Sequence, residues 1–94
     1  MEITEVRVSP IDGDEKLKGF ATVIFDNEFV VRDLKIINGQ KGLFVAMPSR
    51  KMKDGSFKDV AHPLNNEMRQ KLESAVLGEY EKVLAEKQQE EASE

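Results

Sequence analysis

The chain has 94 residues, of which 39% are hydrophobic and 34% charged, and it contains no cysteine. These values suit one compact domain, and they exclude a disulfide framework and a thiolate zinc site. No apolar run approaches the roughly 20 residues that span a bilayer, and the N-terminus lacks the features of a signal peptide. We therefore expect a soluble, cytoplasmic protein with one domain over residues 1–87 and no membrane insertion.

The formal net charge of −4 belongs to the C-terminal end of the chain. Residues 79–94 hold six acidic and two basic residues, whereas the other 78 residues hold twelve of each sign. The body of the protein is thus free to carry a local basic patch. Residues 88–94 have no apolar periodicity, and we expect them to form an acidic, disordered tail.

Two strands are predicted at the start of the chain. Alternation indicates a first strand over residues 2–9, with one face formed by Thr4, Val6 and Val8. Pro10 and the turn-forming residues 12–14 end it. A second strand over residues 17–25 has apolar side chains on both faces, so both faces need cover.

A third strand is predicted over residues 29–37, after a tight turn at Asp26-Asn27. One face of this strand carries Arg32 and three apolar residues, Val30, Leu34 and Ile36. A fourth strand over residues 43–47 is apolar without alternation, which predicts burial on both faces.

The strongest hairpin signal is Asp54-Gly55. This pair favours a type I′ turn, in which both central residues take positive φ, and residues 57–61 would form the returning strand. Successive hairpin-length connections indicate an antiparallel meander and not a parallel sheet.

After Pro63 the pattern becomes helical. Asn65 or Asn66 can cap the helix, and apolar residues recur at helical spacing as far as Leu84. Gly78 costs this helix about 1 kcal/mol relative to alanine, so it marks either a close contact or a weak point.

The predicted fold class is α+β, with an antiparallel β-meander of about five strands followed by a long C-terminal helix. One helix covers one face of such a sheet, and the apolar second and fourth strands need further cover. We therefore expect a homodimer, with the helix arc or an edge strand in its interface.

A basic cluster surrounds the Asp54-Gly55 turn, where four cations fall within nine residues: Arg50, Lys51, Lys53 and Lys58. Cations near the tip of a hairpin can neutralise phosphates, and Arg50 can also pair with the edge of a guanine. These four residues are the predicted nucleic-acid-binding site. The alternative is a solvated, charged turn without a ligand.

Other candidate sites are weaker. His62, the only histidine, lacks companion metal ligands and a catalytic partner, which favours a structural hydrogen bond at a sharp turn. Asp12 and Asp14 match only a fragment of a calcium loop. The aromatic residues Phe44, Phe57 and Tyr80 lie in apolar patterns typical of a core. We predict no enzyme, cofactor, metal or small-molecule substrate.

Residues 25–65 carry a resemblance to a known family. GLFVAMPS at residues 42–49, DGSF at 54–57 and DVAHP at 59–63 resemble the SpoVG family, named for stage V sporulation protein G. The similarity extends over about residues 1–84. It implies a cytoplasmic, dimeric, DNA-binding and RNA-binding regulator of transcription, linked to septation, cell division, the cell cycle and sporulation. It also implicates the basic pair Arg50 and Lys51 in nucleic-acid contact.

The chain departs from the family pattern at Arg32, where histidine is usual, and at Met52-Lys53, where Thr-Pro is usual. Loss of the proline makes the loop less preorganised, and Lys53 adds a cation. A competing hypothesis is a protein–protein module of the division or septation machinery, which would use the same loop and bind no nucleic acid.

Overall fold

The computed structural model describes the backbone of residues 1–92 and the side chains of residues 1–87. Six strands precede one helix, and their bounds are β1 Ile3–Pro10, β2 Leu17–Phe25, β3 Phe29–Gly39, β4 Gly42–Ala46, β5 Ser49–Lys51, β6 Phe57–Asp59 and α1 Asn66–Ala92. The first four strands form an antiparallel meander in the order β1-β2-β3-β4, and β5 pairs with β6 in a separate ribbon. The predicted α+β meander with a C-terminal helix is confirmed.

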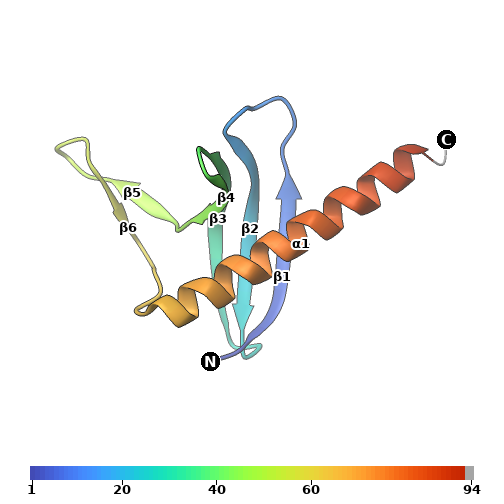
Figure 1. Ribbon diagram of the computed structural model, residues 1–94. Helices are drawn as coiled ribbons and strands as arrows, with labels where there is room; N and C mark the ends of the chain where they lie inside the picture. The colour runs from blue at the N-terminus through green and yellow to red at the C-terminus, as the bar shows by residue number, and fades with distance from the viewer. Residues whose placement is uncertain (93–94) are drawn as a thin grey trace.

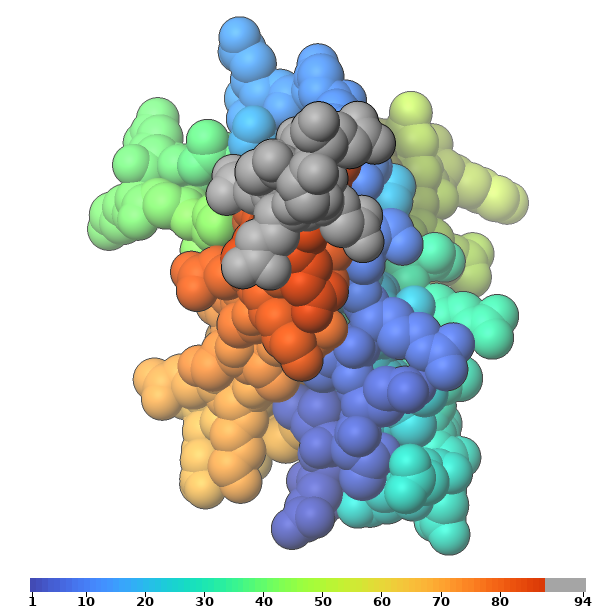
Figure 2. Space-filling model, turned by 90° about the vertical axis from the view of Figure 1, so that its right-hand side faces the viewer, coloured from blue at the N-terminus to red at the C-terminus, as the bar shows by residue number. Residues whose placement is uncertain are grey.

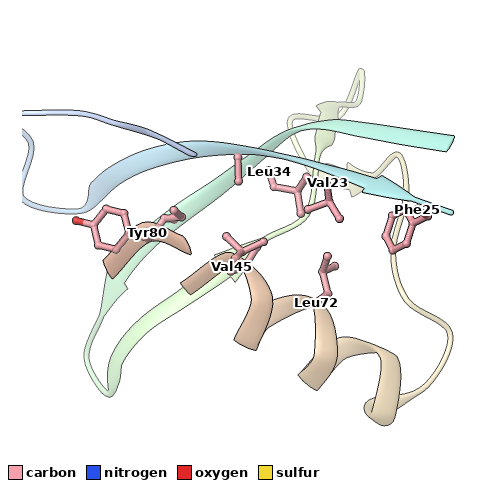
Figure 3. Close-up of a cluster of buried hydrophobic side chains, with 9 residues drawn as sticks. Val23, Phe25, Leu34, Val45, Leu72 and Tyr80 are labelled. Atoms are coloured by element: carbon pink, nitrogen blue, oxygen red, sulfur yellow. The ribbon is translucent and has the colours of Figure 1, made fainter. Parts of the chain in front are cut away.

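The helix covers one face of the four-stranded sheet (Figure 1). Its side chains adjoin those of β1 along the side shown in Figure 2. The buried residues between the sheet and the helix form one core, drawn in Figure 3: Ala21, Val23, Phe25, Leu34, Ile36, Val45, Leu72, Val76 and Tyr80. The apolar arc of the helix, one of the two surfaces expected at a dimer interface, therefore packs against the sheet of its own chain.

The helix begins with an asparagine cap. The Oδ1 of Asn65 accepts a hydrogen bond from the N–H of Met68 at 2.7 Å, which satisfies a backbone donor left free at the helix start. The helix includes residues 88–92, the first part of the predicted tail. The side chains of that segment and residues 93–94 lie outside the described residues, so the prediction of a disordered tail is not tested.

A β-bulge in β1 changes which residues face the core. Ile3 pairs with Phe25 and Glu5 with Ile24, so Thr4 is the extra residue. Its Oγ1 donates to the carbonyl of Ile24 at 3.2 Å and accepts from the N–H of Asn27 at 3.0 Å. The prediction that Thr4 shares a face with Val6 and Val8 was wrong, because the bulge places Ile3 with those two residues against the core.

A second bulge interrupts β3. Ala21 pairs with Leu34 but Val23 pairs with Val31, so β3 has one residue more than β2 over this interval. Asp33 takes a left-handed backbone with φ of 63°. The bulge places Val31 against the core and leaves Val30 44% exposed, contrary to the predicted face.

The fourth strand is buried on one face only within a single chain. Val45 is buried, whereas Phe44 on the other face is 42% exposed. The Phe44 ring lies over Gly39, where a Cβ would approach the ring carbon Cε1 to 2.8 Å. The sequence predicts burial of both faces of β4, but within a single chain only the Val45 face is buried.

Candidate nucleic-acid interface

Residues 49–60 form a two-stranded arm, made of β5, a turn and β6, that projects from the main sheet (Figure 1). Every residue of the arm is exposed. Pro48 precedes the arm. It has no backbone N–H to donate to a neighbouring strand, so the pairing of β4 with the sheet does not continue past it. The N–H of Val60 donates to the carbonyl of Pro48 at 2.7 Å and closes the base of the arm. The predicted return strand is thus part of the arm and does not extend the sheet.

The tip of the arm is a three-residue loop. Gly55 has a φ of 91°, whereas Asp54 does not take positive φ, so the predicted type I′ turn was wrong. The N–H of Gly55 donates to the carbonyl of Met52 at 3.0 Å, and the N–H of Met52 donates to the carbonyl of Ser56 at 2.7 Å. A turn followed by a left-handed glycine is the usual form of a three-residue hairpin loop.

Two of the four predicted cations lie directly opposite each other. Arg50 pairs with Lys58 across the ribbon, so their side chains share one face. Like charges placed directly opposite each other destabilise the strand pair, by about 0.2–1 kcal/mol. No salt bridge among the described residues involves either side chain. This face can therefore bind an anion without first breaking an ion pair.

Lys51 lies on the other face of the arm, directly opposite Phe57. Phe57 is 70% exposed, so the prediction that it belongs to the core was wrong. Lys53 belongs to the loop at the tip. The structure thus brings all four predicted residues into one arm but divides them among its two faces and its tip.

Two carboxylates accompany these cations. The Oγ–H and the N–H of Ser56 donate to Asp54 at 2.6 and 2.9 Å and hold the pKa of Asp54 below its ordinary value. Asp59 is paired with Ser49 near the base. Four cations and two carboxylates leave residues 49–60 with a charge of +2, although the whole chain is acidic.

A groove between β3 and the base of the arm adds residues that local sequence reasoning did not assign to the site. Its lining residues come from both segments and are Phe29, Val30, Val31, Arg32, Asp33, Lys35, Pro48, Ser49, Val60 and Ala61. Arg32, Asp33 and Lys35 place two cations and one carboxylate in this groove. The sequence singles out Arg32 only as a departure from the family pattern, and nothing in it links Arg32 or Lys35 to the arm. The reason is that β3 and the arm are brought together only by the fold.

The weaker candidates have structural roles. The Nδ1–H of His62 donates to the carbonyl of Pro63 at 2.9 Å, as predicted for a residue that organises the turn. Asp14 accepts from the N–H groups of Lys16 and Leu17, and Asp12 forms an ion pair with Lys87 at 2.8 Å.

No group of three or more potential metal ligands occurs among the described residues. Within residues 1–92, no helix is both long and apolar enough to cross a membrane.

This fold and site define a class of small α+β proteins in which one helix covers an antiparallel meander and a cationic hairpin projects from it. The model of the SpoVG family matches residues 1–82. The chain therefore belongs to the SpoVG family.

Relatives cover nearly the whole of the chain. A protein named "Putative septation protein SpoVG" from Clostridium kluyveri is 60% identical over 83 residues, which are 88% of this chain and 86% of the relative. Proteins of the same name from Clostridium beijerinckii and Thermoanaerobacter sp. are 57% and 60% identical, over 92% and 87% of this chain and 94% and 89% of their own lengths. The name describes a septation protein and states no enzymatic activity.

Proposed function

We propose that this protein is a cytoplasmic, dimeric regulator that binds DNA or RNA through the arm, in the context of septation and gene control. The observation that carries the proposal is the pairing of Arg50 with Lys58 on an exposed ribbon. Folding alone gains nothing from two cations placed opposite each other, whereas a phosphate between them would offset their repulsion. Lys51 and Lys53 contact further phosphates along the arm.

The dimer part of the proposal rests on the incomplete edge of the sheet. β4 pairs only with the Lys35–Gly39 part of β3, which leaves the edge at residues 29–34 without a β4 partner. Phe29 and Val30 are 63% and 44% exposed there, and Val60 in the same groove is 65% exposed. A second copy docked at this edge would cover apolar surface and place two arms at a fixed spacing, as recognition of paired half-sites requires.

The test of nucleic-acid binding is the double variant Arg50→Ala, Lys51→Ala. Each phosphate contact contributes about 0.9 to the slope of log affinity against log salt on duplex DNA. Removal of two contacts should lower that slope by about 1.8 and weaken binding at every salt concentration. Binding is measured by fluorescence anisotropy over a range of salt concentrations, on the same DNA and RNA oligonucleotides.

The matched control is Lys16→Ala, Lys41→Ala. It removes the same charge from two exposed lysines outside the arm, and the slope should stay as in the unmodified protein. An unchanged slope in the Arg50, Lys51 variant, or equal losses in both variants, would remove the arm as the binding site. Sedimentation velocity of the unmodified protein tests the dimer, and a monomer at micromolar concentration would contradict it.

A protein–protein module of the septation machinery is the second candidate. The observation that favours it is an apolar pocket beside the helix start, lined mainly by apolar side chains that include Met1, Phe29, Met47 and Met68. This candidate predicts no bound nucleic acid at about 150 mM salt, where phosphate contacts alone are weakened. Selection from random DNA and RNA pools at that salt concentration distinguishes the two, since a recovered motif excludes the second candidate.

A further inference from the structure

The most exposed aromatic ring of the chain is on the arm. Phe57 lies in β6 with 70% of its surface accessible, inside a run of twelve consecutive exposed residues from 49 to 60. It is paired with Lys51, so the ring and the ammonium group share one face of the ribbon. The alternation of the two strands places Ser49 and Asp59 on this face and leaves Arg50 and Lys58 on the other.

We propose that the Phe57 face of the arm binds an unpaired base, with the base stacked on the Phe57 ring and the adjacent phosphate neutralised by Lys51. This inference rests on the proposed function and names its ligand class, a single-stranded segment of DNA or RNA. An aromatic ring beside a cation is the usual arrangement at single-strand sites, because every base presents a flat π-face and every nucleotide carries a phosphate.

Stacking requires that the base be unpaired. In a duplex both faces of each base are covered by its neighbours, so the ring of Phe57 finds no free partner. The opposite face of the arm has no aromatic residue, and its charges are those of Arg50 and Lys58, which act on single and double strands alike. The two faces therefore give the arm a general affinity for phosphates and an added affinity for single strands.

Charge argues against a protein partner on the Phe57 face. Phe57 is its only apolar side chain, and Lys51 and Asp59 lie beside it. The buried centres of protein–protein interfaces are depleted in charged residues. The exposed apolar residues that do gather lie elsewhere, in the groove with Phe29, Val30 and Val60.

The first experiment compares Phe57→Leu with Phe57→Tyr. Leucine keeps an apolar side chain but removes the π-face, whereas tyrosine keeps both. We expect Phe57→Leu to weaken binding of a single-stranded oligonucleotide of about 16 nucleotides by roughly 5- to 100-fold. Binding of the matched duplex should change by less than about twofold, and Phe57→Tyr should resemble the unmodified protein on both ligands.

The second experiment uses Phe57→Trp. The chain contains no tryptophan, so this substitution introduces a single indole reporter at the site. Oligothymidine should quench the tryptophan emission as its bases stack on the indole, and a duplex of the same length should not. Circular dichroism and the melting temperature of each variant check the fold, which should be kept because Phe57 packs in no core.

The outcomes separate this inference from the proposed function. If the unmodified protein binds both ligands and Phe57→Leu weakens both equally or neither, the stacking inference is wrong while binding through the arm stands. If Phe57→Leu instead lowers the mass in solution, Phe57 belongs to a protein interface, and the inference is also wrong. If the unmodified protein binds neither ligand, the proposed function fails, and the inference fails with it.

Discussion

Left-handed residues determine where the second and third strands turn and bulge. Asp26 and Asn27 take φ of 51° and 54° at the β2–β3 turn, a region that is less unfavourable for Asp and Asn than for other side chains. Asp26 also fastens the N-terminus, since its Oδ1 accepts from the N–H of Glu2 at 3.0 Å and its N–H donates to the carbonyl of Glu2 at 2.8 Å. A few short polar side chains thus determine the register of a largely apolar sheet.

Gly78 is a weak point of the helix and not a contact. A Cβ at this position would meet nothing within 4 Å. Gly78→Ala should therefore raise the free energy of unfolding by about 0.5–1 kcal/mol, measured by chemical denaturation. Gly19→Ala is the matched control and should destabilise, because its Cβ would lie 2.9 Å from the backbone oxygen of Ser9. A destabilised Gly78→Ala variant would contradict this account.

Ser56 makes the tip of the arm sensitive to acid. Its hydrogen bonds lower the pKa of Asp54, so they stabilise the folded turn above the unfolded pKa of about 3.9. This stabilisation is lost as the pH falls through the lowered pKa of the folded state. Ser56→Ala should raise the pKa of Asp54 toward its ordinary value in a carbon-detected NMR titration. Ser49→Ala should leave it unchanged, and an unchanged Asp54 pKa in Ser56→Ala would refute the assignment.

At the scale of elements, the arm and the helix are stabilised in different ways. The helix is held by buried side chains, and its cap at Asn65 and its arc at Leu72, Val76 and Tyr80 were all foreseeable from spacing. The arm buries nothing and depends on its own hydrogen bonds at the loop and the base. Substitutions in the arm are therefore expected to alter binding while the core stays intact.

Lys58→Glu should have opposite effects on the stability of the arm and on binding. It replaces a repulsive pair with an attractive one opposite Arg50, and cross-strand pairs of opposite charge contribute roughly 0.2–1 kcal/mol. The amide of Met52, bonded to Ser56 within the arm, should exchange more slowly with solvent. Affinity for nucleic acid should fall in the same variant, whereas Lys58→Gln should show a smaller change in both. Unchanged affinity would show that Lys58 contacts no phosphate.

At the scale of the whole molecule, the negative and the positive charge surpluses lie in different parts of the structure. In the sequence, the negative surplus belongs to residues 79–94, and the described part of this segment, residues 79–92, forms the last turns of α1. The arm carries a positive surplus. Figure 1 shows the arm and the end of α1 extending from different sides of the sheet. An acidic protein can therefore present a cationic arm without the two regions neutralising each other in one chain.

Much of the fold followed from the sequence alone. Period-two and helical spacing located the strands and the helix, because side-chain alternation in each element is a local property. The D-G pair located a hairpin, and the cluster of basic residues located the arm's cations. The family resemblance rested on contiguous motifs in the same region.

Only the tertiary structure decided which faces those residues occupy. Bulges at Thr4 and Asp33 reversed the inward face over part of β1 and β3, which no alternation count detects because one extra residue inverts the pattern. The departure of the chain at Pro48 separates the arm from the sheet and exposes Phe57, which its local apolar pattern predicts to lie in the core. The cross-strand register then placed Arg50 opposite Lys58 and Lys51 opposite Phe57, since pairing between strands depends on the whole loop that joins them.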